Sequence, residues 1–272
     1  MLNVKPVPWK VILTYLVLST CLTTLINLVL FPSPFFDPLE RATGGLINAT
    51  LQANFLNILL FSIIVFGWGK LHPIDVGLDW NKLKQGIFLT VLLWLLTQAI
   101  VLLINWINGD IHLDPRWSER GVTIVLGALI AQLAGNALAE EMAYRGFYLS
   151  QFYIHNQAPV ERERLAWAVL YMASLFAASH LPNRIFQGLG LADFPKDFIF
   201  LFMWGLLFSA VYLVSGNLFL AIGVHALMNQ PTMITEAPFP AGFAVALLGL
   251  ITAIIIGIQK RKSKAVQPIG AV

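Results

Sequence analysis

Two adjacent glutamates, Glu140 and Glu141, close an apolar stretch that begins at Val122. An ionised carboxylate at bilayer depth costs about 2.5–3.5 kcal/mol on insertion scales, so such residues usually face a polar interior and mark a functional site. Arg145 follows Glu141 by four residues and shares its helix face, whereas Glu140 points about 100° away. The spacing therefore predicts a structural ion pair between Glu141 and Arg145 and leaves Glu140 free as a general base.

Three further polar residues lie in or beside apolar stretches: His180, His225 and Asn229. His225 and Asn229 are four residues apart, so a helix aims both at the same neighbour. Together with the glutamates, these residues suit hydrolysis of an amide bond. Glu140 would take a proton from water that one histidine orients, while a second histidine and the asparagine would donate hydrogen bonds to the developing oxyanion.

The same side chains also suit a metal site. Glu140, His180 and His225 offer one carboxylate and two imidazoles, which with water would make a catalytic zinc centre. The sequence contains no His-Glu-x-x-His motif, the commonest signature of zinc proteases. A proton-coupled membrane transporter is an alternative from another class, since buried acids and histidines relay protons in such proteins. The polar residues, however, fall on only three predicted helices, and no paired broken-helix repeat is visible.

The composition identifies the surroundings of these residues as a membrane. Hydrophobic residues make up 58% of the chain and charged residues 11%, against about a quarter charged in a typical soluble domain. A membrane span needs about 20 mainly apolar residues. Eight windows meet or approach that length, which predicts an all-α polytopic bundle of about eight transmembrane helices: 11–31, 54–68, 86–107, 122 onward, 165–181, 198–214, 218–233 and 241–258.

These windows divide the chain into three parts. Residues 1–115 hold helices one to three, residues 116–234 the catalytic core helices four to seven, and residues 235–272 the last helix and a basic tail. The windows put Glu140 and His180 at opposite ends of neighbouring spans, so we expect helix four to continue past Arg145 to about Tyr153 and carry the glutamates inward. Small residues recur about every four positions on helix four and predict close helix packing: Gly127, Ala128, Ala131, Gly135 and Ala139.

Basic residues predict the orientation, because cytoplasmic loops are enriched in lysine and arginine. Of the 17 such residues, twelve fall on one side of the predicted spans, Arg145 among them, and five on the other. This bias predicts an integral protein of the cell membrane with both termini in the cytoplasm. The basic tail is expected to contact anionic lipid headgroups of the bilayer, and no nucleic-acid partner is expected.

The order and spacing of the polar motifs resemble those of the CPBP (Abi) intramembrane proteases, which include type II CAAX prenyl proteases. The resemblance covers about residues 122–229 and is carried by Glu140-Glu141-x-x-x-Arg145, Phe176-x-x-x-His180 and His225-x-x-x-Asn229. It implies transmembrane helices around a polar chamber and an endopeptidase in which Glu140 and His180 activate water, with His225 and Asn229 at the oxyanion.

The resemblance also implies partners. The substrate would be a membrane-associated protein or peptide, prenylated in the analogy with CAAX proteins. Members are widely labelled metalloproteases, which implies a divalent metal such as zinc at Glu140, His180 and His225. Other members are linked to bacteriocin immunity, so a non-catalytic membrane binding protein is a further alternative.

Overall fold

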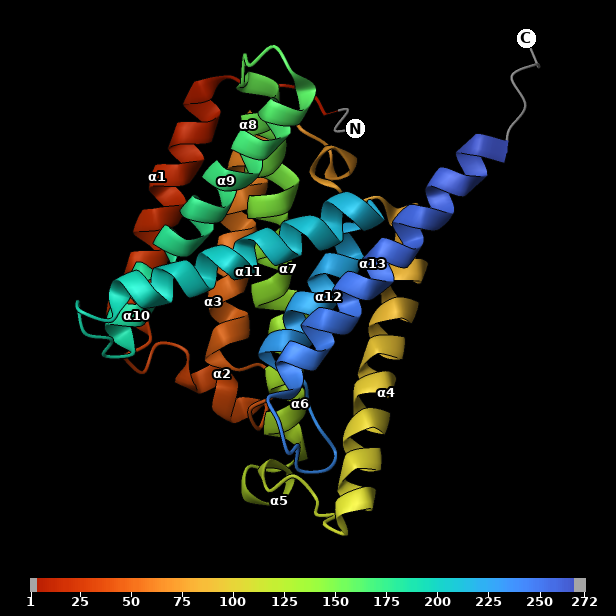
Figure 1. The fold of residues 1–272 in the computed structure, drawn as a ribbon. Coiled ribbons are helices and arrows are strands. Elements are labelled where there is room, and N and C mark those ends of the chain that lie inside the picture. Colours follow the sequence, from red (N-terminus) through yellow and green to blue (C-terminus); the bar gives the residue numbers. More distant parts are fainter. Residues whose placement is uncertain (1–3, 267–272) are drawn as a thin grey trace.

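The computed structural model describes residues 4–266, and this part of the chain is helical without a β-strand. The predicted all-α polytopic bundle is confirmed. The helices, drawn in Figure 1, are α1 (Trp9–Leu25), α2 (Asp37–Ala42), α3 (Ala49–Phe61), α4 (Leu83–Asn108), α5 (Arg116–Glu119), α6 (Val122–Ile130), α7 (Ala137–Glu140), α8 (Leu149–His155), α9 (Glu161–Ser179), α10 (Leu181–Phe186), α11 (Phe194–Ser215), α12 (Leu218–Asn229) and α13 (Ala241–Val266).

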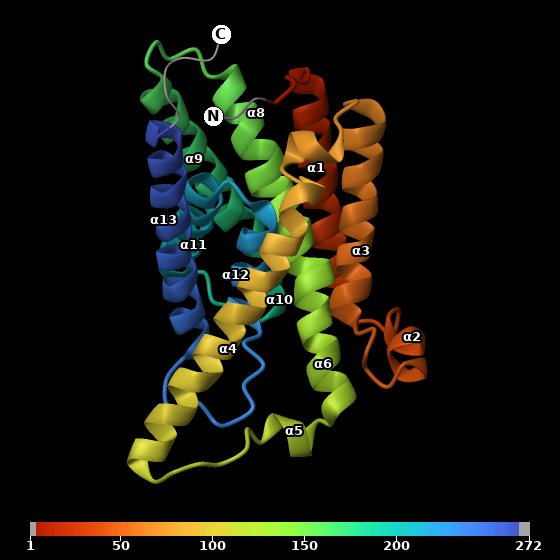
Figure 2. The ribbon, with the colours of Figure 1, turned by 90° about the vertical axis from the view of Figure 1, so that its right-hand side faces the viewer.

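Seven helices in the described range are long and apolar enough to cross a membrane. They run from 20 residues, in Ala49–Trp68, to 34 residues, in Val122–His155. The chain is therefore an integral membrane protein by length and composition. The start of α1 and the end of α13 lie at the same end of the bundle (Figure 2). The basic residues of the expected tail, Lys260, Arg261, Lys262 and Lys264, belong to the last turns of α13, and residues 267–272 lie outside the described part of the chain.

The central helix, Val122–His155, is continuous and joins α6, α7 and α8. It passes Glu140, Glu141 and Arg145 without a break, which confirms the expected continuation and extends it two residues beyond Tyr153. Two π-helical segments, Ala131–Asn136 and Glu141–Tyr148, widen it next to the glutamates. π-Turns inside α-helices frequently accompany functional sites, and the residue spacing alone did not predict them.

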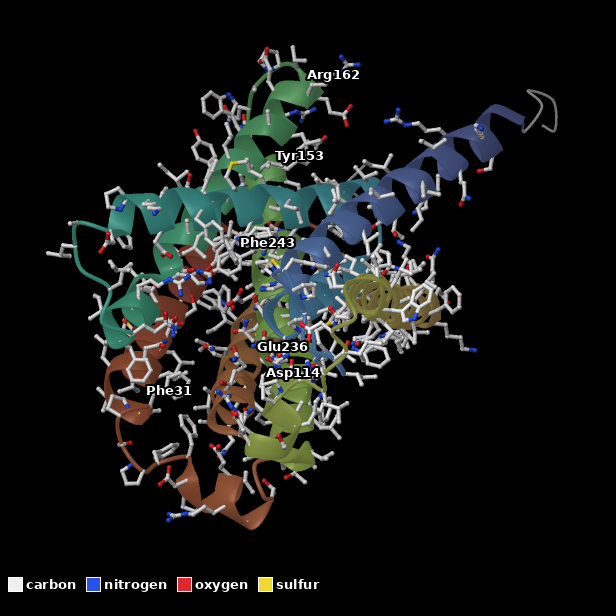
Figure 3. The ribbon with its side chains drawn as sticks, turned by 60° about the horizontal axis from the view of Figure 1, so that its bottom comes forward. Phe31, Asp114, Tyr153, Arg162, Glu236 and Phe243 are labelled. Atoms are coloured by element: carbon white, nitrogen blue, oxygen red, sulfur yellow. The ribbon has the colours of Figure 1, made fainter. Side chains whose placement is uncertain are left out.

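The prediction of a membrane-spanning helix at 218–233 is wrong, because the helix found there is too short. This helix, α12, has 12 residues and covers about 18 Å, well short of the roughly 30 Å hydrocarbon layer. The non-helical segment 230–240 continues toward the end of the bundle where the chain between α4 and α6 lies. There Asp114 and Glu236 lie close together (Figure 3), and an isolated bridge pairs Leu113 with Thr235.

Side chains from α4 satisfy the backbone of this non-helical segment. Thr232 O accepts from Trp94 Nε1 at 3.2 Å and from Gln98 Nε2 at 3.1 Å, and Gln98 Oε1 accepts from Ile234 N at 3.1 Å. Asn105 Nδ2 donates to Glu236 O at 2.8 Å. Irregular backbone is tolerated at membrane depth only where protein groups or water satisfy it, as they do here.

Candidate active site

A polar cavity of about 460 Å³ lies between α1, α3, the central helix, α9, α11 and α12. Glu140, His180, His225 and Asn229 all line it, although they come from two separate helices, the central helix and α12, and from the turn that follows α9. The structure thus brings together the four residues expected to contact substrate or water. Glu141 and Arg145 are fully buried behind them.

Glu140 faces both histidines, one with each carboxylate oxygen. Its Oε1 lies 3.9 Å from His180 Nε2, and its Oε2 lies 3.6 Å from His225 Nε2. The Glu140 side chain is 20% exposed, whereas that of Glu141 is 0% exposed. Among the two adjacent carboxylates, the one that points into the cavity is therefore Glu140.

His180 ends α9, and the last turn of that helix holds its ring. His180 Nδ1 lies 2.7 Å from the carbonyl oxygen of Phe176. Because a carbonyl only accepts hydrogen bonds, Nδ1 carries the proton and Nε2 turns its lone pair toward Glu140. The same carbonyl accepts from Ser179 Oγ at 2.8 Å, and Ser179 Oγ in turn accepts from Tyr144 Oη at 2.5 Å. This network fixes the ring from the central helix as well as from α9.

His225 is held by a buried network on its other ring nitrogen. Its Nδ1 lies 2.8 Å from Glu141 Oε1, which also accepts from Arg145 Nη1 at 3.0 Å. The expected Glu141–Arg145 ion pair is present, but the bond from Glu141 to His225 was not foreseen. As for His180, the paired Nδ1 leaves Nε2 directed at Glu140.

Aromatic rings enclose the guanidinium of Arg145. Its Cζ lies 4.5 Å from the ring centroid of Phe176 and 5.2 Å from that of Phe208, and Phe208 also stacks on His225 at 4.3 Å. Arg145 Nη2 donates to Gly205 O at 3.2 Å. Counting Arg145 among the residues of cytoplasmic connections was therefore wrong, because it lies inside the central helix and is fully buried.

Asn229 lies at the exposed end of α12 and begins a row of side-chain amides. Its Nδ2 donates to Gln132 Oε1 at 3.1 Å, and Asn136 Nδ2 donates to the same oxygen at 3.3 Å. Asn54 Nδ2 then donates to Asn136 Oδ1 at 3.5 Å. The sequence interpretation missed Gln132 and Asn136, although they precede Glu140 by eight and four residues and so signal a polar face of the central helix.

The donor chemistry of Glu140 and the two histidines suits a divalent metal, since each histidine presents Nε2 while an oxygen atom holds Nδ1. The positions of these side chains fit a metal ion less well than their chemistry does. Among the residues that the structure describes, no group of three or more histidine, cysteine, aspartate or glutamate side chains could hold a metal ion as placed. The reaction proposed below therefore uses only side chains of this chain and water.

Comparison with known proteins gives a match to a family model. Residues 121–230 match a family model described as type II CAAX prenyl endopeptidase Rce1-like. No curated protein and no solved structure matches the chain. The matched range contains Glu140, Glu141, Arg145, His180, His225 and Asn229 and leaves out α1 to α5 and α13.

Proposed function

We propose that this chain, whose residues 121–230 match the type II CAAX prenyl endopeptidase Rce1-like model, is an intramembrane endopeptidase in which Glu140 activates water. The observation that carries the proposal is the pair of imidazoles whose Nδ1 atoms are both held by oxygen and whose Nε2 atoms both face Glu140. The family match supports a membrane endopeptidase in general, and the roles given below to individual residues belong to the proposal.

The water molecule binds between Glu140 and His180. The 3.9 Å separation of Glu140 Oε1 and His180 Nε2 lets one water donate a hydrogen to each. The water oxygen then attacks the scissile carbonyl carbon as its proton passes to Glu140. Breaking of the C–N bond follows, and Glu140 returns that proton to the leaving amine.

His225 and Asn229 stabilise the oxyanion. The ring of His225 presents Nε2 to the cavity beside Glu140. A protonated Nε2 then donates to the oxyanion. Asn229 uses one hydrogen of Nδ2 on Gln132 and has a second for the same oxygen. Donors of this kind contribute about 3–4 kcal/mol to the transition state.

The proposed substrate is a membrane-associated protein or peptide, with a prenylated one as the first to try. The proposed setting is the cell membrane, with both termini in the cytoplasm. A divalent metal at Glu140, His180 and His225 stays a prediction. If bound, it would polarise the scissile carbonyl or lower the pKa of water.

The first test compares Glu140→Gln with the unmodified protein on membrane-anchored and prenylated fluorogenic peptides. Loss of the base should lower kcat by about 10²–10⁴-fold while the protein stays folded. Glu163→Gln, an exposed glutamate in the first turn of α9, is the matched control and should leave turnover unchanged. Equal turnover in Glu140→Gln would contradict the assignment, and loss of turnover with a chelator, restored by zinc, would bring a metal into the mechanism.

A further inference from the structure

The cavity wall is unusually rich in side-chain amides. Eight carboxamides line it: Asn27, Asn54, Asn57, Gln132, Asn136, Asn183, Gln187 and Asn229. Each polar group removed from water without a partner costs about 1–3 kcal/mol in proteins. A membrane protein that gathers so many uncharged donors and acceptors around one catalytic glutamate therefore needs a ligand, or water, that pairs with them.

Four of these amides form the row Asn229–Gln132–Asn136–Asn54, and the row has unused hydrogen-bonding capacity. A carboxamide offers two N–H donors and an oxygen with two lone pairs. Gln132 uses Oε1 twice, for Asn229 and Asn136, while Gln132 Nε2 and Asn229 Oδ1 have no partner within the described part of the chain. Both residues border the cavity and neither is buried.

The spacing of the row matches an extended peptide. Gln132, Asn136 and Glu140 follow one another at intervals of four residues along the central helix. The step from Asn136 to Glu140 is about 6 Å at 1.5 Å per residue, and the step from Gln132 to Asn136 lies in the π-helical segment, where the bond between the two side chains shows that they share a face. In an extended chain, groups that point to the same side recur every second residue, or about 6.4–6.8 Å. Consecutive amides on one edge of such a chain therefore meet consecutive side chains of this helix face.

We propose that Gln132, Asn136 and Asn54 form a subsite that binds the main chain of an extended, uncharged peptide segment beside the bond that Glu140 cleaves. The inference rests on the proposed endopeptidase function and adds what the substrate must present. Its N–H and C=O groups pair with side-chain amides as they would with a neighbouring strand. A helical substrate has these groups paired internally, so it must unwind over this row before cleavage.

The test uses a farnesylated fluorogenic peptide and analogues in which one main-chain nitrogen at a time is methylated. Methylation removes a single donor and should raise Kd about 5–10-fold at a nitrogen that pairs with the row, since one such bond contributes about 1 kcal/mol. Kd is measured by anisotropy in the non-cleaving Glu140→Gln background, and KM is measured with Glu140 present. Asn136→Leu keeps the side-chain volume and should abolish the methylation penalty, whereas Gln132→Met serves as a second variant if Asn136→Leu is poorly folded.

Asn183→Leu is the matched control, because Asn183 lines the same cavity but pairs with Asn27 and not with the row. The rise in Kd caused by methylation should persist in Asn183→Leu. Methylation without effect at every position, or an equal penalty in Asn136→Leu and Asn183→Leu, would overturn the subsite. Failure to cleave any peptide would count against the endopeptidase, whereas the Kd comparison would still decide whether the row binds main chain.

Discussion

Glu141 serves two partners with one oxygen. Its Oε1 accepts from Arg145 and from His225, while its Oε2 is buried without a partner in the described chain. The neighbouring carboxylate, Glu140, has none of this support and faces the cavity. Two identical side chains one position apart thus acquire different tasks from their surroundings, because only Glu141 forms an ion pair with Arg145.

Removing the guanidinium of Arg145 should lower the stability of the fold. Arg145→Ala strands Glu141 as an unpaired buried charge and is expected to destabilise the protein by about 3–5 kcal/mol. The measurement is the folded yield and the unfolding midpoint in detergent. Arg41→Ala is the control, since the Arg41–Asp37 pair has the same four-residue spacing but is mostly exposed and should contribute at most about 1 kcal/mol. Similar losses in both variants would refute the structural role of Arg145.

The sequence predicts part of this site. Residues four apart on a helix share a face, which was enough to pair Glu141 with Arg145. The bond between His225 and Glu141 joins residues 84 positions apart, and no local pattern encodes it. The burial of Arg145 was missed for a related reason: its charge resembled a loop signal, whereas the rings that enclose it come from α9 and α11.

The small residues of the central helix are used for close packing. A Cβ on Gly127 would lie 2.1 Å from the carbonyl oxygen of Gly45, and a Cβ on Gly135 would lie 3.2 Å from the side chain of Leu51 in α3. Gly45 itself has a φ of +85°, so the turn that approaches the helix is also restricted to glycine. This contact holds the central helix against the chain that leads into α3.

A single methyl group added at Gly127 should disturb the contact with Gly45. Gly127→Ala forces a backbone carbonyl away and is expected to destabilise the fold by about 1–3 kcal/mol, despite the better helix propensity of alanine. The thermal unfolding midpoint in detergent measures the effect. Gly67→Ala is the control, since its nearest neighbour would be 3.6 Å away. A midpoint in Gly127→Ala at or above that of Gly67→Ala would contradict the packing.

At the level of elements, hydropathy predicts where helices run but not how each ends. The long spans follow from continuous apolar stretches, and the central helix could be extended past Arg145 because Phe147 and Tyr148 keep the pattern apolar. The end of α12 at Asn229 has a signal that hydropathy passes over, because Pro231 disfavours helical backbone at Gln230. Met233 continues the apolar pattern of α12. Trp94 and Gln98, which stabilise the non-helical segment there, lie on α4, far away in the sequence.

For the whole molecule, α1 begins and α13 ends at the same end of the bundle, as an even number of crossings requires. With Arg145 removed from the count, eleven basic residues still fall on the side of the termini against five on the other. The predicted orientation therefore does not depend on the residue that was misplaced.

Cysteine labelling tests this orientation, because Cys21 is the only cysteine in the chain. In a Cys21→Ala background, an impermeant maleimide applied to intact cells should label Asp110→Cys, in the exposed chain after α4, but not Ser263→Cys near the end of α13. Labelling of both after the cells are opened is the control. Labelling of Ser263→Cys alone in intact cells would invert the topology.

The shortness of α12 has a consequence for biosynthesis. A helix of about 18 Å is too short to be retained in the bilayer as an independent span. It must wait until α13 has emerged from the ribosome and segment 230–240 has found its partners on α4. If His225 and Asn229 act as proposed, the active centre is complete only after this late docking step, and the protein stays inactive while its own chain is still being inserted into the membrane.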